Sequence, residues 1–148
     1  MAILVNYQFI GKHIEPYAPA YNHVGDAGFD FRADVPEKIV VQPSQTVVIP
    51  TGLCFDMGRG VELQVRSRSG LAAKNSVQVL NSPGTVDSGY RGEIKVILRN
   101  SGKGVFVVEP GMRIAQGVFS EYLEANFVPG EITESERGSA GFGSTGTK

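Results

Sequence analysis

The chain has 148 residues, enough for one domain with its own core, and its 41% hydrophobic and 20% charged residues are close to the globular average. Its net charge of −1 gives no basic field for nucleic acid or an anionic membrane, and a single cysteine excludes an internal disulfide and a multi-cysteine zinc site. The N-terminal segment does not resemble a signal peptide, and no stretch reaches the length of a membrane span. We therefore expect a cytoplasmic protein, in the host cytoplasm if the gene is viral.

Short strands are predicted along most of the chain, because 19 glycines and 8 prolines indicate many tight turns. Val61–Val65 and Glu93–Leu98 alternate between apolar and polar residues, which predicts one buried face for each. The predicted strands are Ala2–Ile10, Lys38–Val41, Thr46–Pro50, Val61–Val65, Val77–Leu80, Glu93–Leu98, Val105–Val108 and Arg113–Phe119. Strands at this spacing predict an all-β sandwich, jelly roll or barrel.

One short helix and a polar tail interrupt this pattern. Ser69–Lys74 is predicted to be helical, with Ser69 as a candidate cap. Residues 133–148 contain one large apolar residue, Phe142, and cannot pack a core. The chain is therefore divided into a β-domain over residues 1–132 and a flexible C-terminal arm over residues 133–148.

The tail is the first candidate ligand segment. Arg137 precedes a run of Gly, Ser and Thr whose backbone N–H groups and hydroxyls could hold an anion beside the planar guanidinium. Phe142 lies between Gly141 and Gly143, which allow a base to approach its ring. The alternative is a disordered end without a ligand, and the composition of the tail alone favours that alternative.

Two further segments have a phosphate-binding or catalytic character. Arg66–Leu71 places two arginines and two serines at the entry of the predicted helix, which suits phosphate, although a solvated strand end is an equal alternative. Asn81–Gly92 is interpreted as a hairpin whose tip holds Asp87 and Tyr90. A carboxylate there could activate water for attack at phosphorus, or could merely close the turn by bonding its own backbone.

Two polar residues lie inside otherwise apolar strand-like segments. Asp30 lies within Ala27–Asp34, and Gln116 lies within Arg113–Phe119. A buried polar side chain needs a partner or a ligand. Each residue therefore predicts either a structural hydrogen bond or a part of a site.

The order of these segments resembles that of the five motifs of trimeric dUTPases, enzymes that hydrolyse deoxyuridine triphosphate. The matching stretches are Ala-Gly-Phe-Asp near residue 30, Arg-Ser-Gly-Leu-Ala near 70, Gly-Thr-Val-Asp-x-x-Tyr-Arg-Gly-Glu near 90, Arg-Ile-Ala-Gln near 115 and Arg-Gly-x-x-Gly-Phe-Gly-Ser-Thr-Gly at the end. The resemblance covers about residues 25–146. It implies a jelly-roll-like β-barrel in a homotrimer, with shared interface sites closed by a third subunit's tail. The implied reaction converts dUTP and water to dUMP and pyrophosphate.

The resemblance also implies a role for each matching residue. Asp87 matches the base that activates the attacking water, and Tyr90 matches the ring that leaves no room for a 2′-hydroxyl. Asp30 matches an acidic residue that supports the arginine and water network. Phe142 matches the ring that stacks on uracil. The implied substrate contacts are Arg68, Ser69, Gly70, Asn81, Gly84, Thr85, Val86, Tyr90, Lys95, Gln116, Arg137, Phe142, Gly143, Ser144 and Thr145.

Magnesium is expected to be coordinated by triphosphate and water oxygens rather than by protein ligands, since Mg²⁺ keeps much of its hydration shell. Two positions depart from the family pattern. Ser67 replaces a proline that many relatives have, and Met112 replaces a frequent acidic residue. Both positions flank the predicted site rather than form it.

Three other functions compete with dUTP hydrolysis. A dCTP deaminase shares the fold but needs a catalytic glutamate at the position of Ile97, and isoleucine cannot transfer protons. A zinc deaminase is excluded by the single cysteine and by the lack of a His-x-Glu pattern. A nucleotide-responsive trimeric binding or regulatory protein of the same fold is the alternative from another class.

Overall fold

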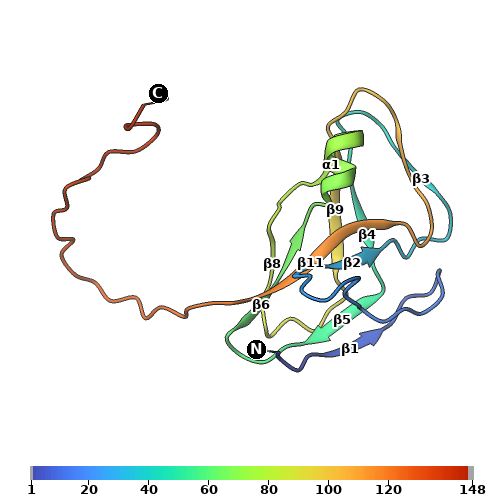
Figure 1. Cartoon of the computed structure of the whole chain (residues 1–148), viewed down its shortest axis with the longest axis horizontal. Coiled ribbons are helices and arrows are strands. Elements are labelled where there is room, and N and C mark those ends of the chain that lie inside the picture. Colours follow the sequence, from blue (N-terminus) through green and yellow to red (C-terminus); the bar gives the residue numbers. More distant parts are fainter. Residues whose placement is uncertain (1, 147–148) are drawn as a thin grey trace.

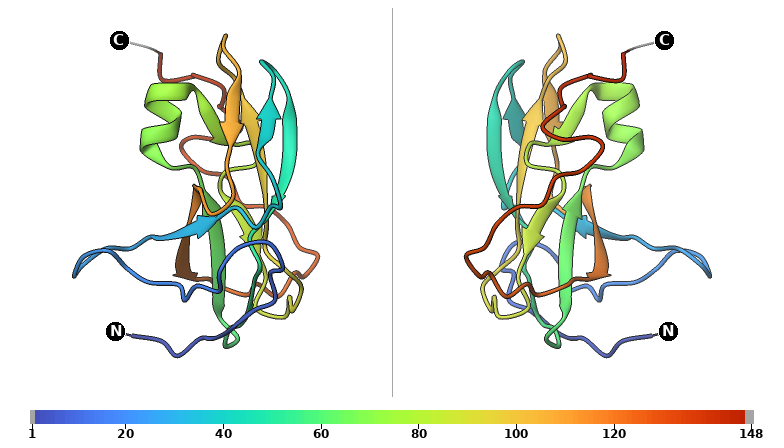
Figure 2. Two further views of the ribbon diagram at one scale, coloured as in Figure 1. Left: turned by 90° about the vertical axis from the view of Figure 1, so that its right-hand side faces the viewer. Right: turned by 90° about the vertical axis from the view of Figure 1, so that its left-hand side faces the viewer.

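The computed structural model describes residues 2–146, and short antiparallel strands form most of its body (Figure 1). The strands are β1 (Asn6–Phe9), β2 (Phe29–Arg32), β3 (Ile39–Val41), β4 (Thr46–Pro50), β5 (Leu53–Asp56), β6 (Val61–Arg66), β7 (Val77–Val79), β8 (Gly84–Val86), β9 (Lys95–Asn100), β10 (Phe106–Val108) and β11 (Arg113–Glu121). The helix α1 (Ser69–Asn75) lies at the end of the body opposite the N-terminus (Figure 2).

The strands form two larger and two smaller sheets. The larger ones have the orders β2-β11-β6-β8 and β4-β9-β7, and the smaller ones are the pairs β1-β5 and β10-β3. One buried cluster joins the two larger sheets, with Phe31 and Leu63 from the first and Val96 and Leu98 from the second. The prediction of an all-β, jelly-roll-like fold is confirmed, although no continuous ladder closes a barrel over residues 2–146. Along the same residues, no helix has the length and apolar character needed to cross a membrane.

Strand positions agree with the sequence pattern, and strand ends differ from it where pairing stops. Thr46–Pro50 is found as predicted, whereas the predicted strand Ala2–Ile10 is reduced to β1 because only these four residues pair with β5. The helix begins at Ser69, as predicted, but the prediction that Ser69 caps it is wrong. Arg68 is the N-cap, because its backbone is extended and its carbonyl accepts the N–H of Ala72 at 3.0 Å.

The N-terminal segment is fastened beside β2 by the buried Asp34 and the partly buried Tyr17. The Asp34 carboxylate, 3% exposed, accepts the backbone N–H groups of residues 12–14 at 3.0, 2.9 and 3.1 Å. The Tyr17 hydroxyl donates to the Thr51 carbonyl and accepts the N–H of Arg32, both at 3.1 Å. Burial raises the pKa of Tyr17 to about 12, so this hydroxyl keeps its proton at neutral pH. These bonds hold β2 in place from its outer side.

Asn100, at the end of β9, links the second large sheet to β3 and to the loop before β10. Its side chain is fully buried, and its amide donates to the carbonyls of Val41 at 2.9 Å and Gly104 at 2.8 Å. Its side-chain oxygen accepts the N–H of Gly102 at 2.9 Å. All of the polar groups of this amide are therefore matched to backbone groups that face it.

We predict that Asn100→Asp lowers the free energy of unfolding by about 3 kcal/mol, because an ionised oxygen would face two carbonyls without a proton to donate. Urea denaturation at pH 7 and fixed protein concentration measures the change. Asn126→Asp is the control, since it makes the same chemical change at an exposed position. Equal stability of Asn100→Asp and the parent protein would contradict this reading of the buried amide.

Candidate active site

Four of the five family-like segments lie on the β2-β11-β6-β8 sheet or directly after one of its strands. Asp30 is in β2, Gln116 is in β11, Arg68 follows β6, and Gly84 opens β8. Asp30 and Gln116 are direct partners across the β2–β11 ladder, so their side chains project from the same face of the sheet. The sheet thus assembles residues that are distant in sequence.

A β-bulge in β11 adds Arg113 to that face. Arg113 lies opposite Arg32 and Ala115 lies opposite Phe31, so Ile114 is the extra residue. Side chains of a regular strand alternate between faces, and the extra residue changes this phase. Arg113 can therefore reach Asp30 from the same side as Gln116.

The Asp30 carboxylate is the electrostatic centre of the group. One of its oxygens lies 2.9 Å from Nε of Arg68, and the other lies 3.3 Å from Nη1 of Arg113. The Asp30 side chain is 17% exposed, so solvent screens these pairs only in part. Arg68 also donates to the Arg113 carbonyl at 3.2 Å. Asp30 thus holds two guanidinium groups at the edge of a pocket that Arg68 and a second acid, Asp26, also line.

Gln116 closes the group on the β6 side. Its amide donates to the Ser67 carbonyl at 2.8 Å, and a Cβ placed on Gly28 would collide with its side-chain oxygen. Gly28 thus leaves the room in which this amide lies. The surrounding pocket has a volume of about 400 Å³ and is lined by Asn22, Asp26, Ala27, Gly28, Asp30, Arg68, Ser69, Gly70 and Gln116.

Ser67, one of the two departures from the family pattern, makes bonds that a proline could not make. Its hydroxyl accepts the N–H of Val79 at 2.9 Å, and its own N–H donates to the Ser82 hydroxyl at 3.3 Å. The segment before Arg68 is therefore fixed to β7 and to the loop before β8.

Asp87 and Tyr90 lie in a turn after β8, outside the lining of the 400 Å³ pocket. The Asp87 carbonyl accepts the N–H of Tyr90 at 3.0 Å, so the backbone rather than the carboxylate closes this turn. The prediction of a simple hairpin is wrong, because β8 pairs with β6 whereas the following strand, β9, pairs with β4 and β7. The turn passes from one large sheet to the other and leaves the Asp87 residue exposed.

The predicted uracil-reading residues adjoin that turn. Gly84 and Thr85 pair with Val65 and Gln64 of β6, and Val86 completes β8 opposite Leu63. A Cβ on Gly84 would lie 3.1 Å from Nδ2 of Asn81, so the Asn81 amide lies close over this backbone. Within the described residues β8 pairs only with β6, which makes it an edge strand with outward backbone groups. Lys95 is exposed at the start of β9, opposite Pro50.

The predicted tail residues that the structure describes do not contact the polar pocket or the Asp87 turn. Residues 123–146 are exposed throughout, and the chain leaves the body after β11 and curves away from it (Figure 1). Arg137 donates to the Ala140 carbonyl at 3.0 Å within a local turn, and Phe142 is fully exposed. Gly143, Ser144 and Thr145 follow in the same exposed segment. Residues 147 and 148 of the predicted arm lie outside the described residues.

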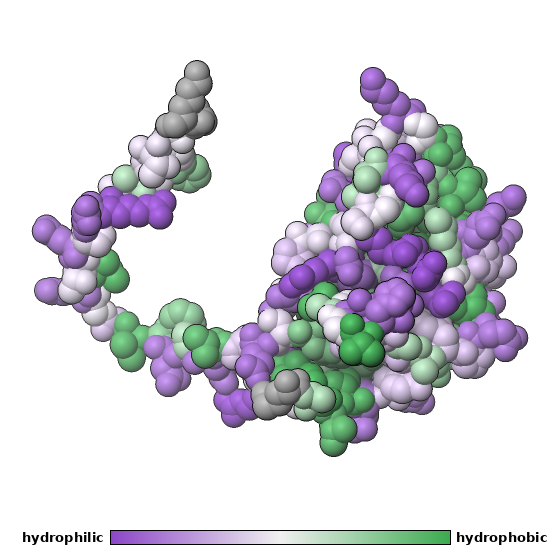
Figure 3. All heavy atoms as spheres, in the orientation of Figure 1, coloured by the Kyte–Doolittle hydropathy of each residue, from purple (hydrophilic) through white to green (hydrophobic). Residues whose placement is uncertain are grey.

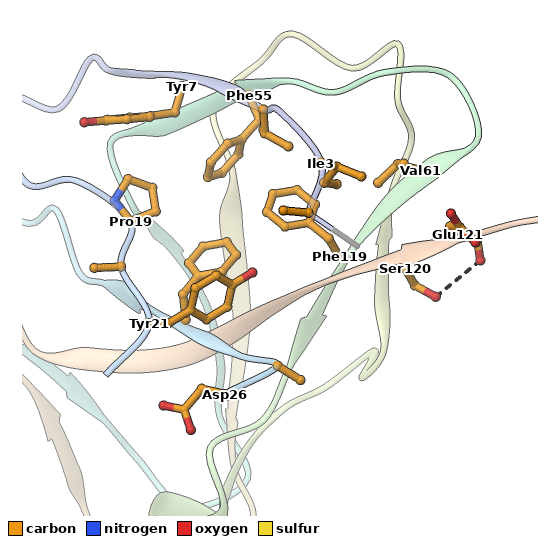
Figure 4. Close-up of a pocket in the computed structure, with 15 residues that line it drawn as sticks. Ile3, Tyr7, Pro19, Tyr21, Asp26, Phe55, Val61, Phe119, Ser120 and Glu121 are labelled. Carbon is orange, nitrogen blue, oxygen red and sulfur yellow. Dashed lines mark hydrogen bonds between the residues drawn. The ribbon is translucent and has the colours of Figure 1, made fainter. Parts of the chain in front are cut away.

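A second, apolar hollow of about 760 Å³ lies at the other end of the body. The rings of Tyr21, Phe55 and Phe119 face it together with Ile3 and Val61 (Figure 4). Hydrophobic side chains also show at the foot of the body and along the root of the tail (Figure 3). Leu123, Phe127, Val128 and Ile132 of that root are between 82 and 98% exposed.

Sequence reasoning missed several residues of this region. Asn22 donates to Asp30 at 3.4 Å, Asp26 lines the polar pocket, and Arg113 pairs with Asp30. Arg91 reaches from the Asp87 turn to Asp56 of β5 at 2.6 Å and donates to the Ser88 carbonyl at 2.7 Å. Arg113 and Arg91 stand within the quoted motifs, but their partners come from other strands, which no local pattern indicates.

No three His, Cys, Asp or Glu side chains of residues 2–146 come together in a way that could hold a metal ion. Two carboxylates line the polar pocket, and one of them, Asp30, is engaged by Arg68 and Arg113. This donor set suits an anion more directly than a cation bound to bare protein.

Comparisons with known proteins agree with this arrangement. The sequence pattern of the dUTPase family matches residues 16–146. Deoxyuridine 5'-triphosphate nucleotidohydrolase of Chlamydia pneumoniae is 53% identical over 130 residues, which are 86% of this chain and 90% of the relative. That of Chlamydia caviae is 48% identical over 134 residues, 88% of this chain and 91% of the relative.

The solved structure of Staphylococcus bacteriophage 80alpha dUTPase with dUPNHPP has a TM-score of 0.85 and 26% identity to this chain. The match covers 97% of this chain and 99% of the phage protein. Sequence and fold therefore agree over nearly the whole length. The chain belongs to the dUTPase family.

Proposed function

We propose that this protein is a dUTP diphosphatase that hydrolyses dUTP to dUMP and pyrophosphate by attack of water at the α-phosphorus. Such a reaction limits uracil incorporation into DNA, supplies dUMP for dTTP synthesis and takes place in the cytoplasm. The observation that carries the proposal is the assembly of four family-like segments by one sheet, with a polar pocket lined by Arg68, Ser69 and Gln116 beside β6 and β11. The phage relative with dUPNHPP supports the same class of substrate.

In this proposal Arg68, Ser69, Gly70 and Gln116 hold the phosphate chain. Asp30 keeps the guanidinium of Arg68 pointing into the pocket, as their 2.9 Å contact indicates. An edge strand suits base recognition, because the outward N–H and C=O groups of Gly84–Val86 can pair with the uracil edge as a further strand would. Cytosine has the opposite donor and acceptor pattern and would leave buried groups unpaired. Asn81, whose amide lies close over Gly84, adds a side-chain amide to this strand edge.

Asp87 is assigned as the general base. Its carboxylate accepts a proton from water as the water oxygen bonds to the α-phosphorus, and the bond from that phosphorus to the pyrophosphate oxygen breaks. Tyr90 packs on the deoxyribose. The guanidiniums of Arg68 and, from the tail, Arg137 stabilise charge on the phosphates, while Lys95 adds a further positive charge.

The proposal includes a magnesium ion that binds together with the triphosphate. The acidic groups of the described site do not form a metal-binding cluster, so phosphate and water oxygens are its expected ligands. When bound there, the ion would neutralise phosphate charge and orient the chain for attack.

We also propose a homotrimer with shared active sites. The apolar hollow and the exposed large apolar residues between Leu123 and Ile132 support burial against other copies, since contiguous apolar surface of this kind marks interfaces. The tail stands clear of its own body, which supports closure of the arm over a site on another subunit. Phe142 would then stack on uracil, and Gly143, Ser144 and Thr145 would enclose the phosphates.

We predict rapid turnover of dUTP in Mg²⁺ and ¹⁸O-water, with little turnover of dTTP, dCTP or UTP. The label should appear in dUMP, because water attacks the α-phosphorus. Mass spectrometry of both products locates it. Label in pyrophosphate would contradict the mechanism, and comparable turnover of dCTP or UTP would contradict the specificity. Binding of dUTP without turnover would favour the regulatory alternative.

Asp87→Asn should lower kcat by about 10³-fold, because the amide cannot accept the proton of water. Tight dUTP binding should remain, since the amide keeps the shape of the carboxylate. Single-turnover kinetics and calorimetry measure the two quantities. Glu109→Gln is the control, because it neutralises an exposed acid outside the proposed site. A near-parental rate for Asp87→Asn would show that another group is the base.

Deletion of residues 137–148 should strongly reduce hydrolysis and leave assembly intact. The deleted residues that the structure describes are polar for the most part and exposed, whereas the apolar segment 123–132 is retained. Light scattering counts the subunits and steady-state kinetics reports activity on the same sample. Loss of assembly upon this truncation would refute the proposal that the body holds the subunits together and the arm serves hydrolysis.

A further inference from the structure

The ring of Tyr90 lies folded across the backbone at Gly92. Its hydroxyl donates to the Glu93 carbonyl at 3.1 Å, and this hydrogen bond spans residues 91 and 92. A Cβ placed on Gly92 would lie 2.6 Å from Cζ of Tyr90, 3.1 Å from Cε2 and closer still to the hydroxyl. Real side chains do not come this close. No side chain at position 92 is therefore compatible with the observed position of the ring.

The backbone beyond Gly92 is fastened to the neighbouring turn. The Glu93 carboxylate accepts the N–H of Gly52 at 2.9 Å, and the N–H of Ile94 donates to the Leu53 carbonyl at 2.8 Å. The buried hydroxyl of Thr51 donates to the Ile94 carbonyl, also at 2.8 Å. Three bonds thus hold residues 93 and 94 in place.

The Tyr90 ring is held far less firmly. Tyr90 is 47% exposed, and one hydrogen bond fixes its hydroxyl. A ring that turns about two side-chain bonds moves more easily than a backbone fixed by several hydrogen bonds. Steric conflict at position 92 would therefore displace the ring and leave the body of the protein unchanged.

We propose that Gly92 is a specificity-determining positioning residue, which acts by keeping the Tyr90 ring flat over the backbone. The inference rests on the proposed function, in which this ring packs on deoxyribose and occupies the space of a ribose 2′-hydroxyl. Without a side chain at position 92, the ring fits tightly against residues 92–93 and presents one fixed face to the sugar. A displaced ring would both lose its contact with deoxyribose and open the space that excludes ribose.

The Gly92→Ala variant tests the proposal through steady-state kinetics with dUTP and with UTP. A displaced ring should lower kcat/KM for dUTP by about 10- to 100-fold, since small misplacements of a substrate have effects of this size. UTP should be affected much less, so the dUTP-to-UTP ratio of kcat/KM should fall by about tenfold or more. An unchanged ratio would overturn the proposal.

Gly89→Ala is the matched control. Gly89 belongs to the same turn, but a Cβ there meets no atom within 4 Å and its φ is not positive. The variant makes the same loss of backbone freedom without the collision. Its dUTP-to-UTP ratio should stay within about twofold of the parent ratio. An equal fall in both variants would assign the effect to the turn as a whole and would refute a special role of Gly92.

A double-mutant comparison separates an effect through the ring from an effect on the backbone. In a Tyr90→Ala background the ring is gone, so adding Gly92→Ala should change neither kcat nor KM further. A full additional loss in that background would refute the coupling. If Gly92→Ala alone fails to fold, Tyr90→Phe takes its place. It removes the bond to Glu93 and should lower the ratio in the same direction by a smaller factor, and a parental ratio would overturn the proposal.

The activity of the parent protein separates a failure of the proposed function from a failure of the Gly92 inference. Failure of the parent to hydrolyse dUTP would refute the proposed function, and the Gly92 inference with it. A parent that prefers dUTP, together with a Gly92→Ala variant that keeps the same preference, would refute the Gly92 inference alone.

Discussion

The pairing of β11 on both of its edges is the interaction on which the site depends. Gln116 is the partner of Asp30 in β2 and of Arg66 in β6, so one residue of β11 aligns both neighbours. A shift of one residue in either ladder would turn Asp30 or Gln116 to the opposite face. The bulge at Ile114 then sets the direction of Arg113 without disturbing the remaining pairs. The polar pocket beside Asp30 and Gln116 is thus a consequence of strand register.

Charge in this protein acts locally rather than over the whole molecule. The net charge is −1, yet Arg68 and Arg113 converge on a single carboxylate that is largely removed from solvent. At such short range and partial burial their attraction is less screened than between exposed charges. Asp30 orients the guanidiniums and leaves part of their charge available. A phosphate chain can therefore be attracted without a basic surface that would also attract nucleic acid.

Glycine supplies space at both ends of the proposed site. Gly28 leaves room for the Gln116 amide, and Gly92 leaves room for the Tyr90 ring. In each case a polar side chain that would face substrate lies against bare backbone. Positions of this kind hold a side chain by shape as well as by hydrogen bonds. They also link specificity to residues that need not touch the substrate themselves.

Much of the fold could be predicted from the sequence, because each strand has a local cause. Alternation identified Val61–Val65 of β6 and most of Lys95–Asn100, and Leu71 with its alanines marked the only helix of the described chain. The segment after Gly84 was misread as a hairpin, because turn residues indicate a reversal but not which sheet the next strand joins. The apolar root of the tail, from Leu123 to Ile132, also gave no sign that it would stand clear of the body.

The sequence by itself determined the all-β class, the order of the five segments and the residue types that suit a nucleotide. These depend on periodicity, turn chemistry and side-chain chemistry, which are properties of short stretches. Only the tertiary structure decided that Asp30, Arg68 and Gln116 line one pocket, that Arg113 pairs with Asp30, and that Asp87 lies outside the pocket lining. Strand register, the bulge in β11 and the passage of the Asp87 turn between two sheets are set by pairing between distant segments. Long-range pairing follows from the packing of the whole core, which no short stretch encodes.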